Sequence, residues 1–386
     1  MLTLILYMIA DAGRRGYVPL LDAFWDECRT LGIDLGRTAP VSAAAFCKAR
    51  QKVPSEMVHA LLRHAAARFD RYFGDLYRLK GHRVFAVDGT KVQVTRSDEL
   101  FDALGWHASA YNPQMLVSTL YDVISRVPHD LSVAPTHGSE RDELTSMLDS
   151  LHVGDILVLD RGYPAFDLMT ELLRRRIHFL VRLPSGTFAA VTRFVEAGGT
   201  DGWVTIRPPQ RLRGTLSDLR ARAVVLPGKD LKPAVFVTDL VEAEFSWSDI
   251  GSLYHMRWES EELYKLEKGD YLGQGQFHSK TYDGLEQEVY ALALFVSIGR
   301  ALTVASAELR GVEPHHIYQK TALLAVGDYI TRLLLEDRED ELQETTRRLL
   351  DRIARTIIPP RPGRSYPRRS YRPRPRWTPT GKKGRK

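Results

Sequence analysis

Cysteine is scarce in this 386-residue sequence, which contains only Cys28 and Cys47. Neither residue belongs to a CxxC pair or to a cluster of cysteines and histidines. This pattern excludes a disulfide framework and a zinc ribbon, and it suits a reducing compartment. We therefore expect a cytoplasmic protein in which both thiols are small buried side chains.

A secretory signal is also lacking. The first ten residues are apolar, but no basic residue precedes them and the run stops at Asp11. Such a run is too short to span a bilayer and has no charged start, so we expect a core helix and no membrane partner. This helix would begin at residue 2 without a capping residue. An uncapped start is also expected if the true N-terminus lies further upstream.

Acidic residues are absent from residues 359–386, which carry 11 of the 54 lysines and arginines. The rest of the chain has 43 basic and 48 acidic side chains, so its net charge is −5, against +6 for the whole sequence. The pI of 9.2 is thus a property of the tail. An acidic body argues against a protein that simply coats DNA. The tail, rich in proline and arginine, is expected to be disordered until it meets a polyanion.

Apolar residues make up 44% of the chain, enough to bury a core in two or three domains. In residues 1–80 they recur at helical spacing, and Ser42 stands where it can cap a short basic helix. That helix fits a DNA-contacting unit and an ordinary helical bundle equally well.

Beyond residue 80 the pattern changes to strands that alternate with helices. Two short apolar runs end in Asp88 and Asp160 and predict buried strands, and residues 115–136 predict a hairpin. This order indicates an α/β fold with a mixed sheet flanked by helices. The predicted regions are 1–80 (helical, with the candidate DNA-contacting helix), 81–182 (first part of the catalytic domain), 183–245 (a glycine-punctuated β-rich insertion, separate from the alternating pattern), 246–310 (completion of that domain), 311–358 (C-terminal helices) and 359–386 (basic tail).

Asp88 and Asp160 are the first candidate site residues, because active groups collect at the carboxyl ends of strands in α/β sheets. Gly89 and Gly162 follow them closely and allow the backbone to turn beside each carboxylate. An Asp-Gly pair is also common in simple turns. Position alone therefore does not assign these acids a function.

A second group of candidates lies between residues 254 and 268. On a continuous helix with 100° per residue, Tyr254, Arg257, Glu261 and Lys268 fall within an arc of about 60°. Met256 and Leu263 would then face the core. A charged helix surface facing water has the same pattern, so the spacing leaves both interpretations open.

The spacing of these four residues resembles the signature around the catalytic glutamate in a large family of bacterial insertion-sequence transposases of the DDE class. Val-Asp88-Gly-Thr and Asp160-Arg-Gly-Tyr are similar to the family's first and second acid regions. The similarity extends from about residue 40 to about residue 310 and includes the β-rich insertion. Relatives usually carry more helical sequence at the start, so this end is either compact or truncated.

The resemblance implies a ribonuclease-H-like catalytic fold in which Asp88, Asp160 and Glu261 hold two Mg²⁺ ions, for which Mn²⁺ can substitute. Two such ions can stabilise the entering and leaving oxygens of an in-line displacement at phosphorus, and Mg²⁺ favours carboxylate oxygens. Tyr254, Arg257 and Lys268 are implied to grip phosphates at the transposon end.

The implied partners are double-stranded DNA, as terminal inverted repeats and target, and a second copy in a synaptic homodimer near the bacterial nucleoid. Four further residues are weaker candidates: Trp258 for base stacking, although a core position is favoured, Arg182 for DNA contact, and Trp203 and Phe236 for stacking within the insertion. Two alternative functions stay open. One is a nuclease of the same fold that does not transfer strands, and the other is a truncated, non-catalytic DNA-binding inhibitor.

Overall fold

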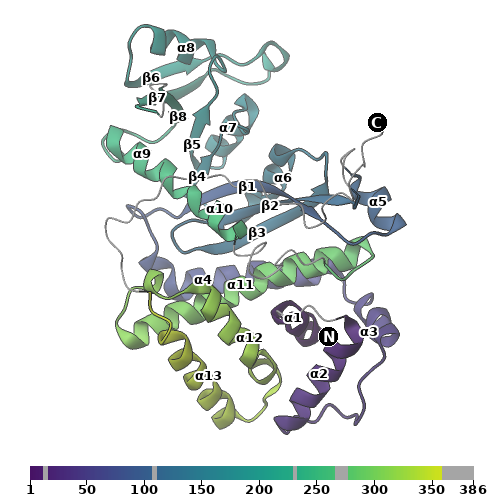
Figure 1. Cartoon of the computed structure of the whole chain (residues 1–386). Helices are drawn as coiled ribbons and strands as arrows, with labels where there is room; N and C mark the ends of the chain where they lie inside the picture. The colour runs from purple at the N-terminus through teal and green to yellow at the C-terminus, as the bar shows by residue number, and fades with distance from the viewer. Residues whose placement is uncertain (12–15, 107–110, 229–232, 266–276, 359–386) are drawn as a thin grey trace, which may run out of the picture.

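The computed structural model describes residues 1–11, 16–106, 111–228, 233–265 and 277–358. The predicted disorder of residues 359–386 lies outside the described residues. A mixed sheet with helices on both faces organises the molecule (Figure 1). Its strands are β1 (Val84–Gln93), β2 (Gln114–Asp122), β3 (Val127–Pro135), β4 (Ile156–Leu159), β5 (His178–Leu183), β6 (Asp201–Ile206), β7 (Leu219–Leu226) and β8 (Ala234–Thr238).

The strand order in the sheet is β3-β2-β1-β4-β5-β8-β7-β6. Strands β1, β2 and β3 form an antiparallel meander, while β4 lies parallel to β1 and β5 lies parallel to β4. Three antiparallel strands followed by two parallel ones are the arrangement of a ribonuclease-H-like sheet. The α/β fold class expected from the sequence is confirmed.

Both faces of the central strands are buried. Val84 and Ala86 of β1 belong to the core on one face, and Phe85 and Val87 belong to the core on the other. A strand buried on both faces needs apolar residues at successive positions, which explains the continuous apolar run before Asp88. Helices cover these faces: α4 (Ser55–Phe73) and α11 (Tyr282–Arg310) on one, α6 (Glu140–Met147) and α7 (Phe166–Arg174) on the other.

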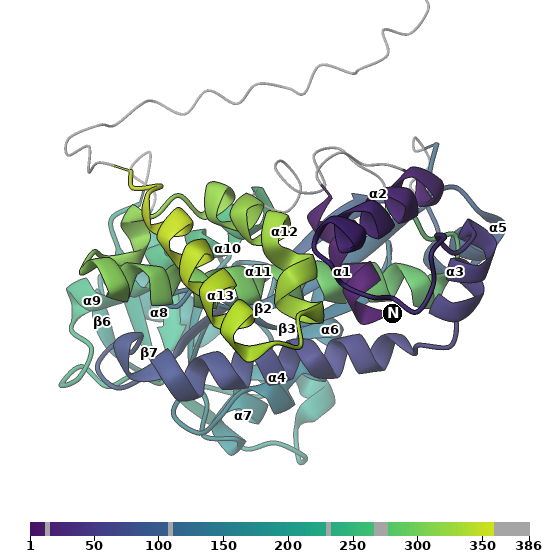
Figure 2. The same cartoon turned by 90° about the horizontal axis from the view of Figure 1, so that it is seen from below.

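Helix α11 is the one described helix that is long and apolar enough to cross a membrane. Its most apolar window is 78% buried inside the protein. It packs between the sheet and the helices of the two terminal regions, as Figures 1 and 2 show. Its composition is therefore that of a core helix.

The N-terminal and C-terminal helices form a layer below the sheet, on the side of α4 and α11 (Figure 1). Helix α1 (Leu2–Ala10) packs against α11 and α12 (Gln319–Leu335), and α13 (Glu339–Ala354) also packs against α11 and α12. The helical prediction for the start of the chain is confirmed. The helices are α1 (Leu2–Ala10), α2 (Tyr17–Thr30), α3 (Ala43–Arg50), α12 (Gln319–Leu335) and α13 (Glu339–Ala354).

Ser42 caps α3 as expected, because its hydroxyl oxygen accepts the backbone N–H of Ala45 at 3.2 Å. The last arginine of this helix, Arg50, is only 4% exposed. It donates to Glu288 at 2.7 Å and to Gln287 at 2.8 Å, both on α11. Arg50 therefore joins two helices of the core, and the DNA-contacting interpretation fails for this residue.

Two sequence-based expectations are wrong in detail. Cys28 is buried, but Cys47 is only partly buried. Residues 183–245 are β-rich as predicted, but they were expected to be an insertion that does not continue the α/β pattern, and their strands do continue the sheet. Strand β8 pairs antiparallel with β5, from Leu180 opposite Thr238 to Leu183 opposite Val235, so the insertion extends the same sheet, with α8 (Ala189–Glu196) packed on β6 and β7.

Candidate active site

Asp88 and Asp160 lie on neighbouring parallel strands. The register of β1 and β4 pairs Val84 with Ile156 and Ala86 with Val158. Continued by two residues, this register sets Asp88 opposite Asp160, and adjacent strands are about 4.8 Å apart. Because side chains alternate between faces, both aspartates share the face of Val84 and Ala86.

Both carboxylates are held by the backbone that follows them. The N–H of Gly89 donates to Oδ1 of Asp88 at 3.1 Å, and the N–H of Gly162 donates to Oδ1 of Asp160 at 2.7 Å. The side chain of Asp88 is 24% exposed, and its Oδ2 lies 4.0 Å from Nη1 of Arg257. The structure thus brings the two sequence-predicted aspartates together at one edge of the sheet.

Glu140 is a residue of this region that sequence reasoning missed. A Cβ at Gly89 would lie 2.5 Å from the carboxyl carbon of Glu140, so the glycine leaves room for that side chain. The buried hydroxyl of Tyr163 donates to Oε2 of Glu140 at 3.0 Å. Glu140 therefore connects the start of α6 to the loop that carries Asp160, on the opposite face of the sheet from the aspartates.

The sequence offers an ordinary reason for Glu140, which is why it attracted no attention. It is the first residue of α6, after the N-cap Ser139, and acids are favoured there by the helix dipole. The available signal was Gly89, since a glycine after a strand-borne aspartate indicates a close neighbour as well as a turn.

The segment carrying the predicted signature is a pair of helices rather than one. Helix α9 (Trp247–Met256) begins with a capping box between Ser246 and Asp249, and α10 (Trp258–Lys265) follows it. Between them, the N–H of Arg257 donates to the carbonyl of Tyr254 at 3.2 Å, and the N–H of Ser260 donates to that of Arg257 at 3.1 Å. These i to i+3 bonds interrupt the regular helix, so the prediction of a continuous helix is wrong. Arg257 itself keeps helical dihedral angles, with φ −51° and ψ −28°.

Arg257 nevertheless lies beside Asp88, and Tyr254 lies beside Arg257. Nη1 of Arg257 is 4.0 Å from Oδ2 of Asp88, and its guanidinium is 5.9 Å from the ring centre of Tyr254. The guanidinium of Arg182, at the end of β5, lies 5.9 Å from the same ring. Arg257 thus lies next to Asp88, and the ring of Tyr254 has two guanidinium groups 5.9 Å from its centre, those of Arg182 and Arg257.

Glu261 is part of α10, and this helix packs against β1 with Leu263 buried at 3% exposure. Leu263 faces the core as predicted, and Met256 is partly buried against the same core. The side chain of Glu261 and the whole of Lys268 lie outside the described residues. Trp258 is half-buried, so its burial does not distinguish a core position from a role in base stacking.

The donor set suits a hard divalent cation. Two aspartates at adjacent strand ends supply carboxylate oxygens, which Mg²⁺ prefers while it keeps several of its waters. Among the side chains that the structure describes, no group of three His, Cys, Asp or Glu residues could hold a metal ion. A third protein ligand would have to come from a side chain such as that of Glu261.

The two aromatic candidates of the insertion differ. Phe236 is 3% exposed and packs edge-on against Tyr254, with ring centres 4.8 Å apart, so the base-stacking hypothesis is wrong for it. Trp203 is 42% exposed, and Arg220 lies 5.1 Å from its ring centre. Stacking on Trp203 stays a prediction.

The family model of the transposase DDE domain matches residues 79–298, more than half of the chain. The chain belongs to the transposase DDE-domain family. The matched segment runs from just before β1 into α11, and it contains Asp88, Asp160, Arg257 and Glu261. The fold over these residues is therefore that of a transposase DDE domain.

No curated protein sequence matches this transposase-family chain. Among solved structures, it is similar to a piggyBac transposase in a synaptic complex with hairpin DNA, determined by cryo-electron microscopy. The TM-score is 0.42 and the identity 9%, over 73% of this chain and 59% of that chain. The chain thus spans less than two thirds of that transposase's length.

Proposed function

We propose that this protein is a DNA transposase of the cut-and-paste type, which cleaves DNA at the ends of its element and joins those ends to a target. The observation that carries the proposal is the in-register pair of Asp88 and Asp160 at one sheet edge, with the Glu261-bearing helix packed against β1. Membership in the DDE family supports the reading of these three acids as the catalytic set.

Asp88, Asp160 and Glu261 would hold two divalent ions, Mg²⁺ with Mn²⁺ as a substitute. When bound, the ions supply charge stabilisation for the entering and leaving oxygens of a displacement at phosphorus. Asp88 would serve both ions, with Asp160 on the adjacent strand and Glu261 on the helix packed against β1 each holding one. No side chain needs to act as a nucleophile: water attacks first, and the released 3′-hydroxyl attacks the target in the second step.

The basic residues near Asp88 orient the DNA. Arg257 presents a guanidinium next to the acid, and such a planar fork suits two phosphate oxygens at once. Arg182 shares the ring of Tyr254 with it, so the two cations can meet successive phosphates. Lys268 would extend this grip as a point charge. Glu140 and Tyr163 position the loop of Asp160 from behind the sheet.

The partner we propose is double-stranded DNA, both as the terminal inverted repeats and as the target. Two ends must be handled together in a cut-and-paste reaction, so we propose a homodimer in the synaptic complex. The chain would act at the nucleoid of a bacterial cell, as an insertion-sequence protein does.

The test is a cleavage and joining assay with the full chain. A labelled duplex carrying the element's terminal repeat is incubated with Mg²⁺ and a supercoiled plasmid, and the ends of all products are mapped. Cuts at the repeat boundary followed by joined products are expected. Cuts without joining would support the nuclease that does not transfer strands. Specific binding without cuts would support the non-catalytic inhibitor.

A further inference from the structure

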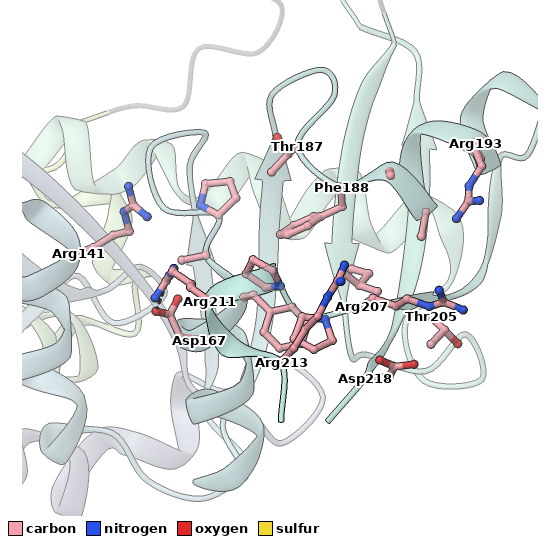
Figure 3. Close-up of a pocket in the computed structure, with 18 residues that line it drawn as sticks. Arg141, Asp167, Thr187, Phe188, Arg193, Thr205, Arg207, Arg211, Arg213 and Asp218 are labelled. Atoms are coloured by element: carbon pink, nitrogen blue, oxygen red, sulfur yellow. Dashed lines mark hydrogen bonds and ion pairs between the residues drawn. The ribbon is translucent and has the colours of Figure 1, made fainter. Parts of the chain in front are cut away.

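A groove of about 800 Å³ lies beside the insertion, on the face of the sheet that α6 and α7 cover (Figure 3). Its walls are the loop that opens α7, the loop between β5 and α8, and the segment that follows β6. We call it the arginine groove, because five arginines line it. They are Arg141, Arg193, Arg207, Arg211 and Arg213.

The positive charge of the arginine groove is poorly neutralised. Two aspartates, Asp167 and Asp218, line the groove, which leaves a net charge of +3 against its five arginines. Arg211 forms an ion pair with Asp167 at 3.1 Å. Within the described part of the chain, no salt bridge involves the other four arginines, and all four are exposed. Figure 3 shows Arg141 at one end of the groove and Arg193 at the other.

Two helices begin at the same groove. Residues 165–167 open α7 and residues 188–190 open α8, and both segments line the walls. Neither N-cap, Ala165 or Phe188, accepts a hydrogen bond with its side chain. At α7 the carboxylate of Asp167 already accepts the N–H of Leu168 at 3.3 Å. At α8, which has no acid in its first turn, the first N–H groups and the positive end of the helix dipole add to the field of the arginines.

We propose that the arginine groove binds the phosphodiester backbone of DNA close to the bond that is cleaved. Guanidinium groups bind phosphate oxygens in pairs, and arginines at both ends of a groove suit a repeating anion rather than a single small one. Pro164, in the groove wall, is four residues after Asp160. Four residues span at most about 14 Å, which corresponds to about four base pairs at 3.4 Å each.

This inference rests on the proposed function, because it takes Asp160 as part of the cleavage site. It adds a second contact region, on the other face of the sheet from Arg257, and it assigns a role to the insertion. DNA passing over the sheet edge at Asp160 would continue along the insertion and be held there by residues that have no part in the chemistry.

The experiment compares two triple variants of the full chain that have the same net charge. One changes the groove (Arg193→Gln, Arg207→Gln and Arg213→Gln). The control changes exposed arginines elsewhere (Arg37→Gln, Arg71→Gln and Arg355→Gln). Affinity for a short fluorescent duplex and for a single strand is measured by anisotropy over a series of salt concentrations, with thermal unfolding as the check on the fold.

The loss of three phosphate contacts in the groove variant should lower the log–log salt slope for the duplex by about 2.7 and the affinity by tenfold or more. In the control variant the slope should change by less than about 0.9, the value for a single contact. A loss confined to the single strand would still support a backbone contact, made to an opened end. Should the groove triple variant unfold, Arg207→Gln alone is expected to lower the slope by about 0.9.

Equal slopes and affinities for the two triple variants would overturn the inference. So would a groove variant that loses binding to polyglutamate but keeps full DNA affinity, since the groove would then be a protein-binding site. These readouts do not depend on cleavage. The catalytic proposal is tested separately by Asp88→Asn, which should keep the salt slope of the wild-type chain.

Discussion

Nη1 of Arg257 lies 4.0 Å from Oδ2 of Asp88. The arginine comes from the turn between α9 and α10, and the aspartate from the central strand of the sheet. Their side chains are only 13% and 24% exposed. The guanidinium of Arg257 is therefore positioned to bind a phosphate that approaches the carboxylate of Asp88.

Changing Arg257→Ala should therefore impair cleavage at the element end by tenfold or more while divalent-metal binding persists. A charge-assisted hydrogen bond to phosphate is worth about 1.5–3 kcal/mol, which is the basis of this magnitude. Lys265→Ala is the matched control, since it removes a cation from α10 that does not belong to the signature. An equal effect of the two variants on cleavage of an end-bearing duplex would mean that this surface only supplies general charge. The same comparison with Lys268→Ala tests the phosphate contact proposed for Lys268, which lies outside the described residues.

The hydrogen bond between Tyr163 and Glu140 predicts a positioning effect. Tyr163→Phe removes the donor, so the Asp160 loop should be held less firmly. We expect a lower kcat for cleavage, a higher Mg²⁺ concentration for half-maximal rate, and unchanged DNA affinity. Glu140→Gln keeps an oxygen that can accept from the hydroxyl, so it should retain more activity than Glu140→Ala. Tyr72→Phe, at an exposed position on α4, serves as the control. If Glu140→Gln and Glu140→Ala lose equal activity with no change in Mg²⁺ dependence, the positioning role is wrong.

Deleting residues 359–386 should mainly weaken DNA binding that is independent of sequence. The segment carries 11 basic residues, and each phosphate contact contributes about 0.9 to the log–log salt slope. A decrease of several units is expected in a titration of affinity against salt. Replacing the eleven cations by glutamine, at unchanged length, should reproduce the deletion. An unchanged slope would show that the tail does not contact DNA.

His129 predicts a loss of stability in weak acid. Burial, followed by the positive charge of Arg83, lowers the pKa of this imidazole to about 3 from an ordinary value near 6.5. A base whose pKa is depressed in the folded state contributes stability that is present above pH 6.5 and is lost as the pH falls toward 3. Between pH 7 and pH 5 the loss should be about 2 kcal/mol.

The measurement is urea denaturation of the wild type, His129→Leu and His315→Gln at both pH values. The leucine variant should lose less stability on acidification than the wild type, because its side chain cannot bind a proton. The exposed His315 serves as the control and should keep the full pH dependence. Identical pH dependence in all three proteins would contradict the depressed pKa.

Much of the fold could be predicted from local patterns in the sequence. Apolar runs that end in Asp88 and Asp160 indicated strands buried on both faces, and Ser42 marked a helix start that the structure confirms. The place of the insertion could not be predicted in this way. The pairing of β5 with β8 joins residues more than fifty positions apart, and no local periodicity specifies such a partner.

The candidate site was predicted in part, for a similar reason. Strand ends and a spaced signature indicated the three acids, but the angular calculation assumed an unbroken helix, and the two tight turns at Arg257 interrupt it. Glu140 was missed because its position at a helix start already had an explanation. The arginine groove was missed because its members are spread from residue 141 to residue 213, and only Arg207, Arg211 and Arg213 are near neighbours in the sequence.

The central claim is that Asp88, Asp160 and Glu261 together perform divalent-metal-dependent cleavage of DNA. The most direct measurement is the rate of cutting of an end-bearing duplex by Asp88→Asn, Asp160→Asn and Glu261→Gln, with Asp75→Asn as an exposed control. Each site variant removes one charge with little change in shape. The three should fold and bind DNA but lose cleavage and joining, the control should stay fully active, and EDTA should abolish activity in the wild type. Full activity of any one site variant, or substantial cutting in EDTA, would contradict the claim.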